Sequence, residues 1–355
     1  MTLSGPVEVV GAGLLGTSIA LACRRAGLEV LLTDTSVVNL RTASGLGAGR
    51  PRRPEDRPQL VVVAVPPDLL GETIAEALSR SDAVVTDVGS IKSRPLAEVL
   101  ARVDPATSAR YVGSHPMAGS ERSGPLAATA TLFDGRPWAV VRHPGSDPAA
   151  VDLVADLAQV CGAVVVELGP EEHDRAVART SHLPHLAAVL VAGRLRDAPG
   201  RDLALSGQGV RDVTRIAASD PRLWEQIVSA NSEAVLEVLG EVREQLDALL
   251  DAVRAGERET LRAVLTRGVE GTRAIPGKHG GPAVPVTSCF VAVSDTPGVL
   301  ARLFADAGES GVNIEDVRID HDPGRAGGLV ELVVEERREA QLRESLESRG
   351  WVTHR

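Results

Sequence analysis

The chain has 355 residues, which predicts two or three domains, each long enough to bury a core. Its formal net charge is −10 at pH 7 and its positive residues are scattered, which argues against binding to nucleic acid or an anionic membrane. The three distant cysteines form no CxxC pair, and the chain shows no leader-like start and no apolar run of about 18 residues, so we expect a cytoplasmic protein without a structural zinc site or a membrane span.

Short β-branched runs recur through the first part of the chain. They read VEVV, EVLL, LVVVAV, AVVTDV and WAVV, and polar or helical stretches such as LLGTSIALACRRAG separate them. This alternation indicates βαβ units and a parallel sheet. The proline-rich, charged residues 51–58 read as a surface loop. We predict a Rossmann-like α/β domain over residues 1–168.

A glycine motif follows the first predicted strand. Gly11, Gly13 and Gly16 form GxGxxG at the start of an amphipathic helix. Such glycines permit a tight turn, close approach of a pyrophosphate and close helix packing, and the helix N-terminus supplies free N–H groups. Asp34 ends the next strand at the spacing expected for a carboxylate that binds the ribose hydroxyls. A 2′-phosphate would face that charge, so NAD is favoured over NADP; the alternative is a Rossmann-like domain that binds another ligand.

Further cofactor contacts are predicted at the same edge of the sheet. Leu15 lies inside the glycine motif, and the stretch AVPP, which contains Val65 and Pro67, ends another strand. Ligands of doubly wound sheets bind at the carboxyl ends of the strands. We therefore expect these three residues to contact the dinucleotide.

Two polar turns are predicted to open onto this edge. AVVTDVGSIKS ends a strand and turns through Ser90, and YVGSHPMAGSE ends another and turns through His115. A histidine near its ordinary pKa of about 6.5 can take a proton from an alcohol as hydride leaves the same carbon. Glu121 is placed to orient a nearby group. The alternative makes His115 a loop histidine hydrogen-bonded to the backbone.

The pattern changes to helical spacing after a strand-like AVVVEL, and we predict an all-helical domain over residues 169–273. Asp174 and His185 are eleven residues apart, close to three helical turns, with Ser181 on the same stripe. Pro184 cannot donate to the carbonyl of Thr180, which predicts a kink with a free acceptor.

Polar groups around a kink suggest the wall of a binding site, and an exposed polar face is the simpler alternative. A metal site of His173, His182 and His185 is a further alternative. We disfavour it because Pro184 distorts the turn and no thiolate lies near. We predict no metal.

Arg211 and Arg215 are four residues apart, on one helical face if the segment is helical. Two such guanidinium groups suit a substrate with two carboxylates. The alternative is that they pair with the chain's own Asp212 or Asp220.

Residues 274–285 are rich in Gly and Pro and read as a linker. Beyond it, residues 286–355 give the order β, α, β, β, α, β, which is the ferredoxin-like arrangement.

Five ordered motifs, GAGLLG, DVGSIK, GSHPMAGSE, HDRAVARTSHLPH and GVRDVTRIAASDPRLW, resemble the prephenate and arogenate dehydrogenases of tyrosine biosynthesis. The tail, with DTPGVLARLF and GVNIEDV, resembles an ACT domain, a module that often binds amino acids.

The resemblance implies a role for each matching residue. His115 would hydrogen-bond the ring hydroxyl and accept its proton, Ser90 would help to position both, and Arg215 would bind the substrate carboxylate. Trp224 matches a tryptophan near the dimer contact. Further residues that match the family's substrate pocket, or replace a residue common there, are His185, Asp174, Glu121, Arg211 (where several relatives have lysine) and Gln208 (where glycine is common).

The implied reaction is an NAD-dependent oxidative decarboxylation in a homodimer joined through the helical domain. Prephenate would give 4-hydroxyphenylpyruvate and arogenate would give tyrosine, and no residue decides between them. Two rivals stay open: a β-hydroxyacid dehydrogenase of related architecture, and a degenerate dehydrogenase whose tail senses an amino acid. A tyrosine effector in the tail would be framed by Asp295, Gly298, Leu300 and Asn313. The alternative is a tail that only stabilises the dimer.

Overall fold

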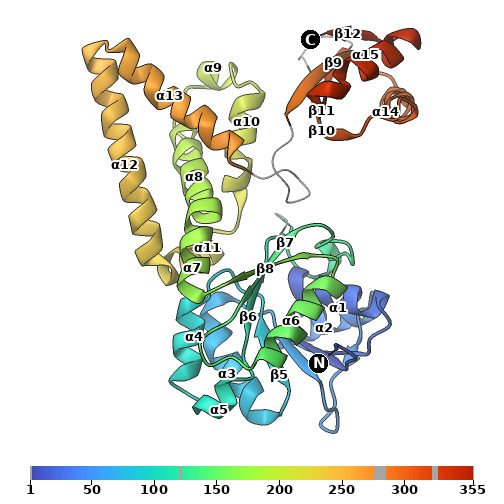
Figure 1. Cartoon of the computed structure of the whole chain (residues 1–355), viewed down its shortest axis with the longest axis vertical. Coiled ribbons are helices and arrows are strands. Elements are labelled where there is room, and N and C mark those ends of the chain that lie inside the picture. The colour runs from blue at the N-terminus through green and yellow to red at the C-terminus, as the bar shows by residue number, and fades with distance from the viewer. Residues whose placement is uncertain (1, 120–121, 276–284, 322–326, 355) are drawn as a thin grey trace. The chain divides into compact units, whose positions relative to one another are not determined.

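The computed structural model describes residues 2–119, 122–275, 285–321 and 327–354. The chain forms two compact units, Met1–Ala248 and Leu249–Arg355, each of which is described by itself (Figure 1).

The first unit begins with a parallel sheet in the order β3-β2-β1-β4-β5. Its strands are β1 Val7–Val10, β2 Val30–Thr33, β3 Arg50–Pro51, β4 Leu60–Val63 and β5 Val84–Asp87. Alternate residues of β4 are buried on opposite faces, so both faces of the sheet are covered and β4 reads as a continuous apolar run. The predicted parallel sheet is confirmed.

Helices cover both faces of this sheet (Figure 1). The helices on one face are α1 Leu14–Arg25, α2 Val37–Gly45 and α6 Pro148–Val160, and those on the other are α3 Leu70–Arg80 and α4 Ser93–Leu100. The short helix α5 Pro105–Ser108 follows α4. The fold is a doubly wound Rossmann-like domain, whose ligand edge lies at the carboxyl ends of the strands.

A second, three-stranded sheet corrects the prediction for His115. The strands are β6 Gly113–Pro116, β7 Pro137–Val141 and β8 Val164–Leu168; β6 is antiparallel to β7, and β7 is parallel to β8. His115 lies inside β6, opposite Ala139, and not in a turn after a strand. Between β6 and β7 the described residues contain only the 3₁₀ turn η2 Pro125–Ala127. A parallel pairing needs a longer crossover, usually a helix.

The helical part follows β8, as predicted. It consists of α7 Pro170–Val177, the π-helical turn η3 Ala178–His182, α8 Leu183–Leu195, α9 Gly200–Leu203, α10 Gln208–Thr214, the 3₁₀ turn η4 Arg215–Ala218, α11 Pro221–Ala230 and α12 Ser232–Ala255. Where a kink with a free acceptor was predicted before Pro184, the structure has the π-helical turn η3. Because a π-turn is wider than an α-turn, Asp174 and His185 do not share one regular α-helical stripe.

The second unit contains α13 Arg258–Arg273 and a small α+β fold. Its elements are β9 Val286–Ser294, α14 Val299–Glu309, β10 Ile314–His321, β11 Gly327–Glu335, the 3₁₀ turn η5 Glu336–Arg338, α15 Glu339–Ser348 and β12 Val352–His354. The sheet is antiparallel in the order β10-β11-β9-β12, so the predicted βαββαβ arrangement is confirmed. Most of the predicted linker, residues 276–284, lies outside the described residues. In the described part of the chain, no helix has the length and apolar character needed to cross a bilayer.

Candidate active site

The glycine turn between β1 and α1 has the geometry of a phosphate-binding loop. Gly11 has φ +102°, and a Cβ there would lie 2.3 Å from the carbonyl oxygen of Ala64. A Cβ on Gly16 would lie 1.9 Å from the carbonyl oxygen of Gly11. Both positions therefore require glycine. At Gly13 a Cβ would meet no described heavy atom within 4 Å, so the turn is open on the side where a ligand can approach.

Asp34 is tied directly to this turn. One carboxylate oxygen accepts the N–H of Ala12 and the other accepts the N–H of Ser36, each at 2.6 Å. These bonds fix the carboxylate beside the glycine turn, where it retains lone pairs for hydroxyl donors. At the end of β4, Val65 and Pro67 are half-buried, and Val65 lies next to Gly11. Leu15 packs against the core beneath the turn.

His115 heads a chain of hydrogen bonds. Its Nδ1 lies 3.0 Å from Nε2 of His173, and Nδ1 of His173 lies 2.8 Å from a carboxylate oxygen of Asp174. His173 is fully buried and His115 is 8% exposed. Nε2 of His115 makes no hydrogen bond to any described residue, so it is the ring nitrogen available to a ligand.

The carboxylate of Asp174 closes the chain and binds the start of α4. It accepts the backbone N–H groups of Lys92 and Ser93, each at 2.8 Å. These are N–H groups that the first turn of a helix leaves unpaired. Burial alone raises the pKa of Asp174, but the hydrogen bonds from His173 and Ser93 outweigh burial and lower the pKa to about 2. The group is therefore ionised at neutral pH.

The two imidazoles are neutral at pH 7. Burial, helped by the neighbouring His173, Lys92 and His182, holds the pKa of His115 well below 6.5, and Asp174 opposes this shift. Burial also lowers the pKa of His173, against the hydrogen bond to Asp174. A neutral imidazole with a free nitrogen is the form that accepts a proton.

A buried ion pair lies next to this chain. The side chains of Lys92 and Asp87 form a direct salt bridge, and the hydroxyl of Tyr111 donates to the other Asp87 oxygen at 2.8 Å. A Cβ on Gly113 would lie 2.9 Å from Cδ of Lys92, so a larger residue there would push the lysine aside. The sequence patterns did not predict these groups. The lysine two residues after Ser90, close to a predicted site turn, was the available signal.

A second aromatic and polar group lies on the helical side. His185 stacks on Trp224 with ring centroids 3.5 Å apart, and His182 meets the edge of the same indole. Nδ1 of His182 lies 3.3 Å from the side-chain amide of Asn231, and its buried Nε2 has no partner within the described residues. Burial lowers the pKa of His182 to about 4.

The remaining predicted substrate residues are more exposed. Arg215 begins η4, Arg211 lies in α10, and the side chain of neither forms an ion pair or hydrogen bond with a described residue. Gln208 donates to Asp212 at 2.8 Å. Ser90 is half-buried and makes no side-chain hydrogen bond in the described part of the chain; the partner of His115 is His173. Glu121 lies outside the described residues.

The predicted effector residues lie in the second unit. Asp295 is exposed, Gly298 caps α14 with φ +90°, and Leu300 packs against the small domain's core. The side chain of Asn313 donates to Glu315 at 2.7 Å. Their role stays a prediction.

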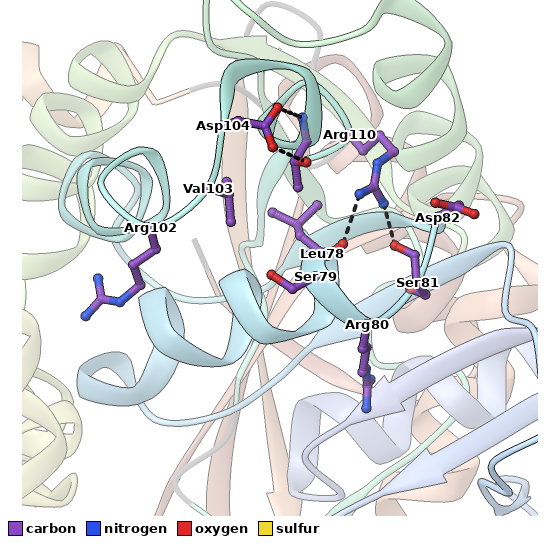
Figure 2. Close-up of a pocket in the computed structure, with 10 residues that line it drawn as sticks. Leu78, Ser79, Arg80, Ser81, Asp82, Arg102, Val103, Asp104 and Arg110 are labelled. Carbon is purple, nitrogen blue, oxygen red and sulfur yellow. Dashed lines mark hydrogen bonds between the residues drawn. The ribbon is translucent and has the colours of Figure 1, made fainter.

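The cavity of about 470 Å³ shown in Figure 2 is not this site. It lies between the end of α3 and the start of β5, at the amino ends of the strands. Arg110, which lines it, donates to the backbone carbonyls of Leu78 and Ser81 (Figure 2) and to that of Ala83. Its guanidinium is therefore occupied by the end of α3.

The first domain has a glycine turn and an acidic strand end on a doubly wound sheet, and a helical domain follows that contacts a buried neutral imidazole. This combination defines the class of nucleotide-dependent dehydrogenases. Two family models match the chain: "Prephenate dehydrogenase, nucleotide-binding domain" over residues 19–167, and "Prephenate dehydrogenase, dimerization domain" over residues 169–267.

Proteins with similar sequences or structures are also named prephenate dehydrogenases. A probable prephenate dehydrogenase of Streptomyces niveus is 36% identical over 97% of this chain and 98% of its own length. A prephenate dehydrogenase of Bacillus subtilis is 28% identical over 88% of this chain and 87% of its own. The crystal structure of prephenate dehydrogenase from Aquifex aeolicus in complex with hydroxyphenyl propionate and NAD⁺ matches with a TM-score of 0.69 at 28% identity, over 76% of this chain and 98% of that chain.

The chain belongs to the prephenate dehydrogenase family, whose members are NAD-dependent oxidoreductases. The predicted family, enzyme class and fold class are confirmed. The domain boundaries at residues 168 and 273 and the individual site residues stay predictions.

Proposed function

We propose that this enzyme uses NAD to oxidise and decarboxylate prephenate to 4-hydroxyphenylpyruvate. The observation that carries the proposal is the neutral imidazole of His115, whose Nδ1 is engaged by His173 and whose Nε2 has no partner among the described residues. It follows β5, in the same Rossmann-like domain as the glycine turn. Such a nitrogen can accept the proton of the substrate's ring hydroxyl during oxidation.

The chain's residues suit a dinucleotide. The open space at Gly13, the unpaired N–H groups at the start of α1 and the fixed carboxylate of Asp34 would hold the pyrophosphate and the ribose. When bound, NAD supplies the acceptor for the hydride that leaves the ring carbon. Loss of carbon dioxide then makes the ring aromatic, which makes the reaction effectively irreversible.

The substrate's carboxylates need cationic partners. Arg215 carries a guanidinium that no described side chain neutralises, so it is available for bidentate binding of a carboxylate. His185 lies on α8, which packs against η4, the turn that carries Arg215. We assign these two residues to the substrate and give Arg211 a supporting electrostatic role. Ser90, at the end of β5, would orient the substrate hydroxyl.

We also propose a homodimer formed through the helical domain, in the cytoplasm. A row of large apolar side chains is exposed along α12: Val242, Leu246, Leu250 and Val253. Exposed apolar rows of this kind mark protein–protein contacts. The three cysteines are free and buried, in keeping with a reducing compartment. The βαββαβ tail would bind tyrosine as an effector.

The test is the absorbance of NADH formed from prephenate and, separately, from arogenate, with NADP⁺ in place of NAD⁺ as a comparison. We expect turnover of prephenate with NAD⁺ and its loss in His115→Asn. The matched control is His143→Asn, because His143 is also buried but hydrogen-bonds Ser108 and Gly145. Turnover of arogenate alone would move the assignment to tyrosine formation, and no turnover of either substrate would refute the proposal.

A further inference from the structure

The chain of hydrogen bonds behind His115 has a defined direction. The carboxylate of Asp174 is ionised and can only accept, so the proton between it and His173 resides on Nδ1 of His173. The Nε2 of a neutral His173 then carries a lone pair, and it accepts a hydrogen bond from the Nδ1–H of His115. The Nε2 of His115 is left without a proton.

The alternative tautomer would break this chain. If His115 carried its proton on Nε2, two lone pairs would face each other across 3.0 Å, in a place that water does not reach because His173 is fully buried. An unsatisfied buried acceptor is costly, so the protein selects one tautomer of His115.

Another buried histidine has the opposite arrangement. The N–H of Gly145 points to Nδ1 of His143 at 3.2 Å, and Nε2 of His143 lies 3.2 Å from the carbonyl oxygen of Ser108. The proton of His143 therefore resides on Nε2. The tautomer assigned to His115 is thus a property of its own surroundings and not of burial in general.

We propose that His173 and Asp174 are positioning residues that hold His115 as its Nδ1–H tautomer and so present Nε2 as the base. The inference rests on the proposed function for its kinetic consequence only. His173 and Asp174 begin the helical domain, whereas His115 belongs to the Rossmann-like domain. Docking of the two domains therefore sets the chemical state of the base.

The carboxylate is well placed for this role. Its bonds to the N–H groups of Lys92 and Ser93 fix its position on backbone, so His173 cannot rotate without losing a charge-assisted bond. The charged or titratable groups that face His115 are His173, Lys92, His182 and Asp174, and Asp87 also faces His173. Lys92 and Asp87 form an ion pair with each other, whereas the carboxylate of Asp174 is hydrogen-bonded directly to the ring of His173.

The direct test is nitrogen NMR on the full-length protein labelled with ¹⁵N-histidine, at pH 7. The signal of His115, assigned by its absence in His115→Asn, is expected to show the proton on Nδ1, with His143 as the internal reference for Nε2–H. In His173→Leu the acceptor is lost and the Nε2–H form of His115 should become populated. A wild-type signal with the proton on Nε2 would overturn the proposal without any activity measurement.

The kinetic test compares two replacements of His173. Leucine removes the acceptor, whereas the side-chain oxygen of glutamine can still accept from Nδ1 of His115. We expect kcat to fall by about 10- to 100-fold in His173→Leu, because an unsatisfied buried donor shifts the tautomer equilibrium by roughly that factor. His173→Gln should recover most of the loss, with KM and the dissociation constant of NADH nearly unchanged in both.

Equal losses in the leucine and glutamine variants would show that His173 only packs the domain interface, and would overturn the proposal. His143→Gln, a buried histidine outside the chain of hydrogen bonds, is the control and should retain wild-type kcat. A thermal melt identifies variants that fail to fold, and the wild-type NMR result then decides alone. If wild-type protein turns over neither prephenate nor arogenate but shows the Nδ1–H signal, the proposed function fails while the tautomer assignment stands.

Discussion

Replacing Gly13 by alanine should weaken cofactor binding without harming the fold. A methyl group there meets no described heavy atom within 4 Å, and the backbone at φ −80° and ψ −161° is open to alanine. A phosphate oxygen approaches a backbone N–H to about 2.9 Å, whereas carbon needs about 3.5–4 Å. The methyl group would therefore push the pyrophosphate outward by roughly 0.5–1 Å.

The expected cost is about 1–3 kcal/mol, as for other overpacked sites, which raises the dissociation constant of NADH by roughly 5- to 150-fold. The free energy of unfolding should stay equal or rise by up to about 1 kcal/mol, because alanine restricts the unfolded chain. Gly16→Ala should behave in the opposite way. Its Cβ would lie 1.9 Å from a backbone oxygen, so the fold should lose about 3 kcal/mol or more.

NADH fluorescence titration gives the affinity, and thermal and urea unfolding give the stability. Gly45→Ala is the matched control, because its Cβ would also meet no described heavy atom, on α2 of the same domain. Wild-type NADH affinity in Gly13→Ala would refute the placement of the dinucleotide on this turn. Wild-type stability in Gly16→Ala would refute the close backbone packing at Gly16.

Four further predictions follow from the same geometry. His115→Asn should lower kcat by about 10²- to 10⁴-fold with little change in KM. Because burial lowers the pKa of His115, the acid limb of the wild-type pH profile of kcat/KM should lie below pH 6.5. An acid limb above pH 7 would contradict this prediction. Lys92→Met should cost about 3–5 kcal/mol of stability by leaving Asp87 buried without its ion-pair partner, and adding Asp87→Asn should recover part of it in urea unfolding. His182 has a folded pKa of about 4, so the unfolded state binds more protons between pH 6.5 and 4 and stability should fall as pH is lowered through that window, by about 3 kcal/mol in total; an unchanged urea midpoint between pH 7 and 5 would argue against a buried neutral ring. Leu246→Asp on the exposed apolar row of α12 should give monomers in sedimentation, with Glu244→Asp as the control, and an intact dimer would exclude this face.

Much of the fold follows from local patterns. The strands of the parallel sheet are short β-branched runs. Gly11 and Gly16 lie so close to neighbouring backbone that a side chain at either position would clash, which is why glycine marks the turn after the first strand. The distortion before Pro184 likewise follows from one missing N–H group. These features depend on residues close together in sequence, so the sequence alone predicts them.

The partner of His115 could not be predicted in this way. His173 lies 58 residues away along the chain, and its contact with His115 exists only once the helical domain packs on the Rossmann-like domain. The sequence suggested Ser90 as the neighbour of His115 and Asp174 as a substrate contact, because both lie near predicted strand ends or kinks. In the structure both oxygens of Asp174 accept protein N–H groups instead.

The π-helical turn η3 explains why the helical side of the site has two distinct groups of side chains. With regular α-helical spacing, Asp174 and His185 would point the same way after three turns. The wider turn at Ala178–His182 separates them. Asp174 is directed to His173 and the start of α4, whereas His185 stacks on Trp224 beside the η4 turn that carries Arg215. One continuous helical segment thus contacts His115 through its first half, and η4, which carries Arg215, through its second half. Restoring a regular helix by deleting one residue of η3 should disrupt both arrangements together, even though neither group is itself replaced.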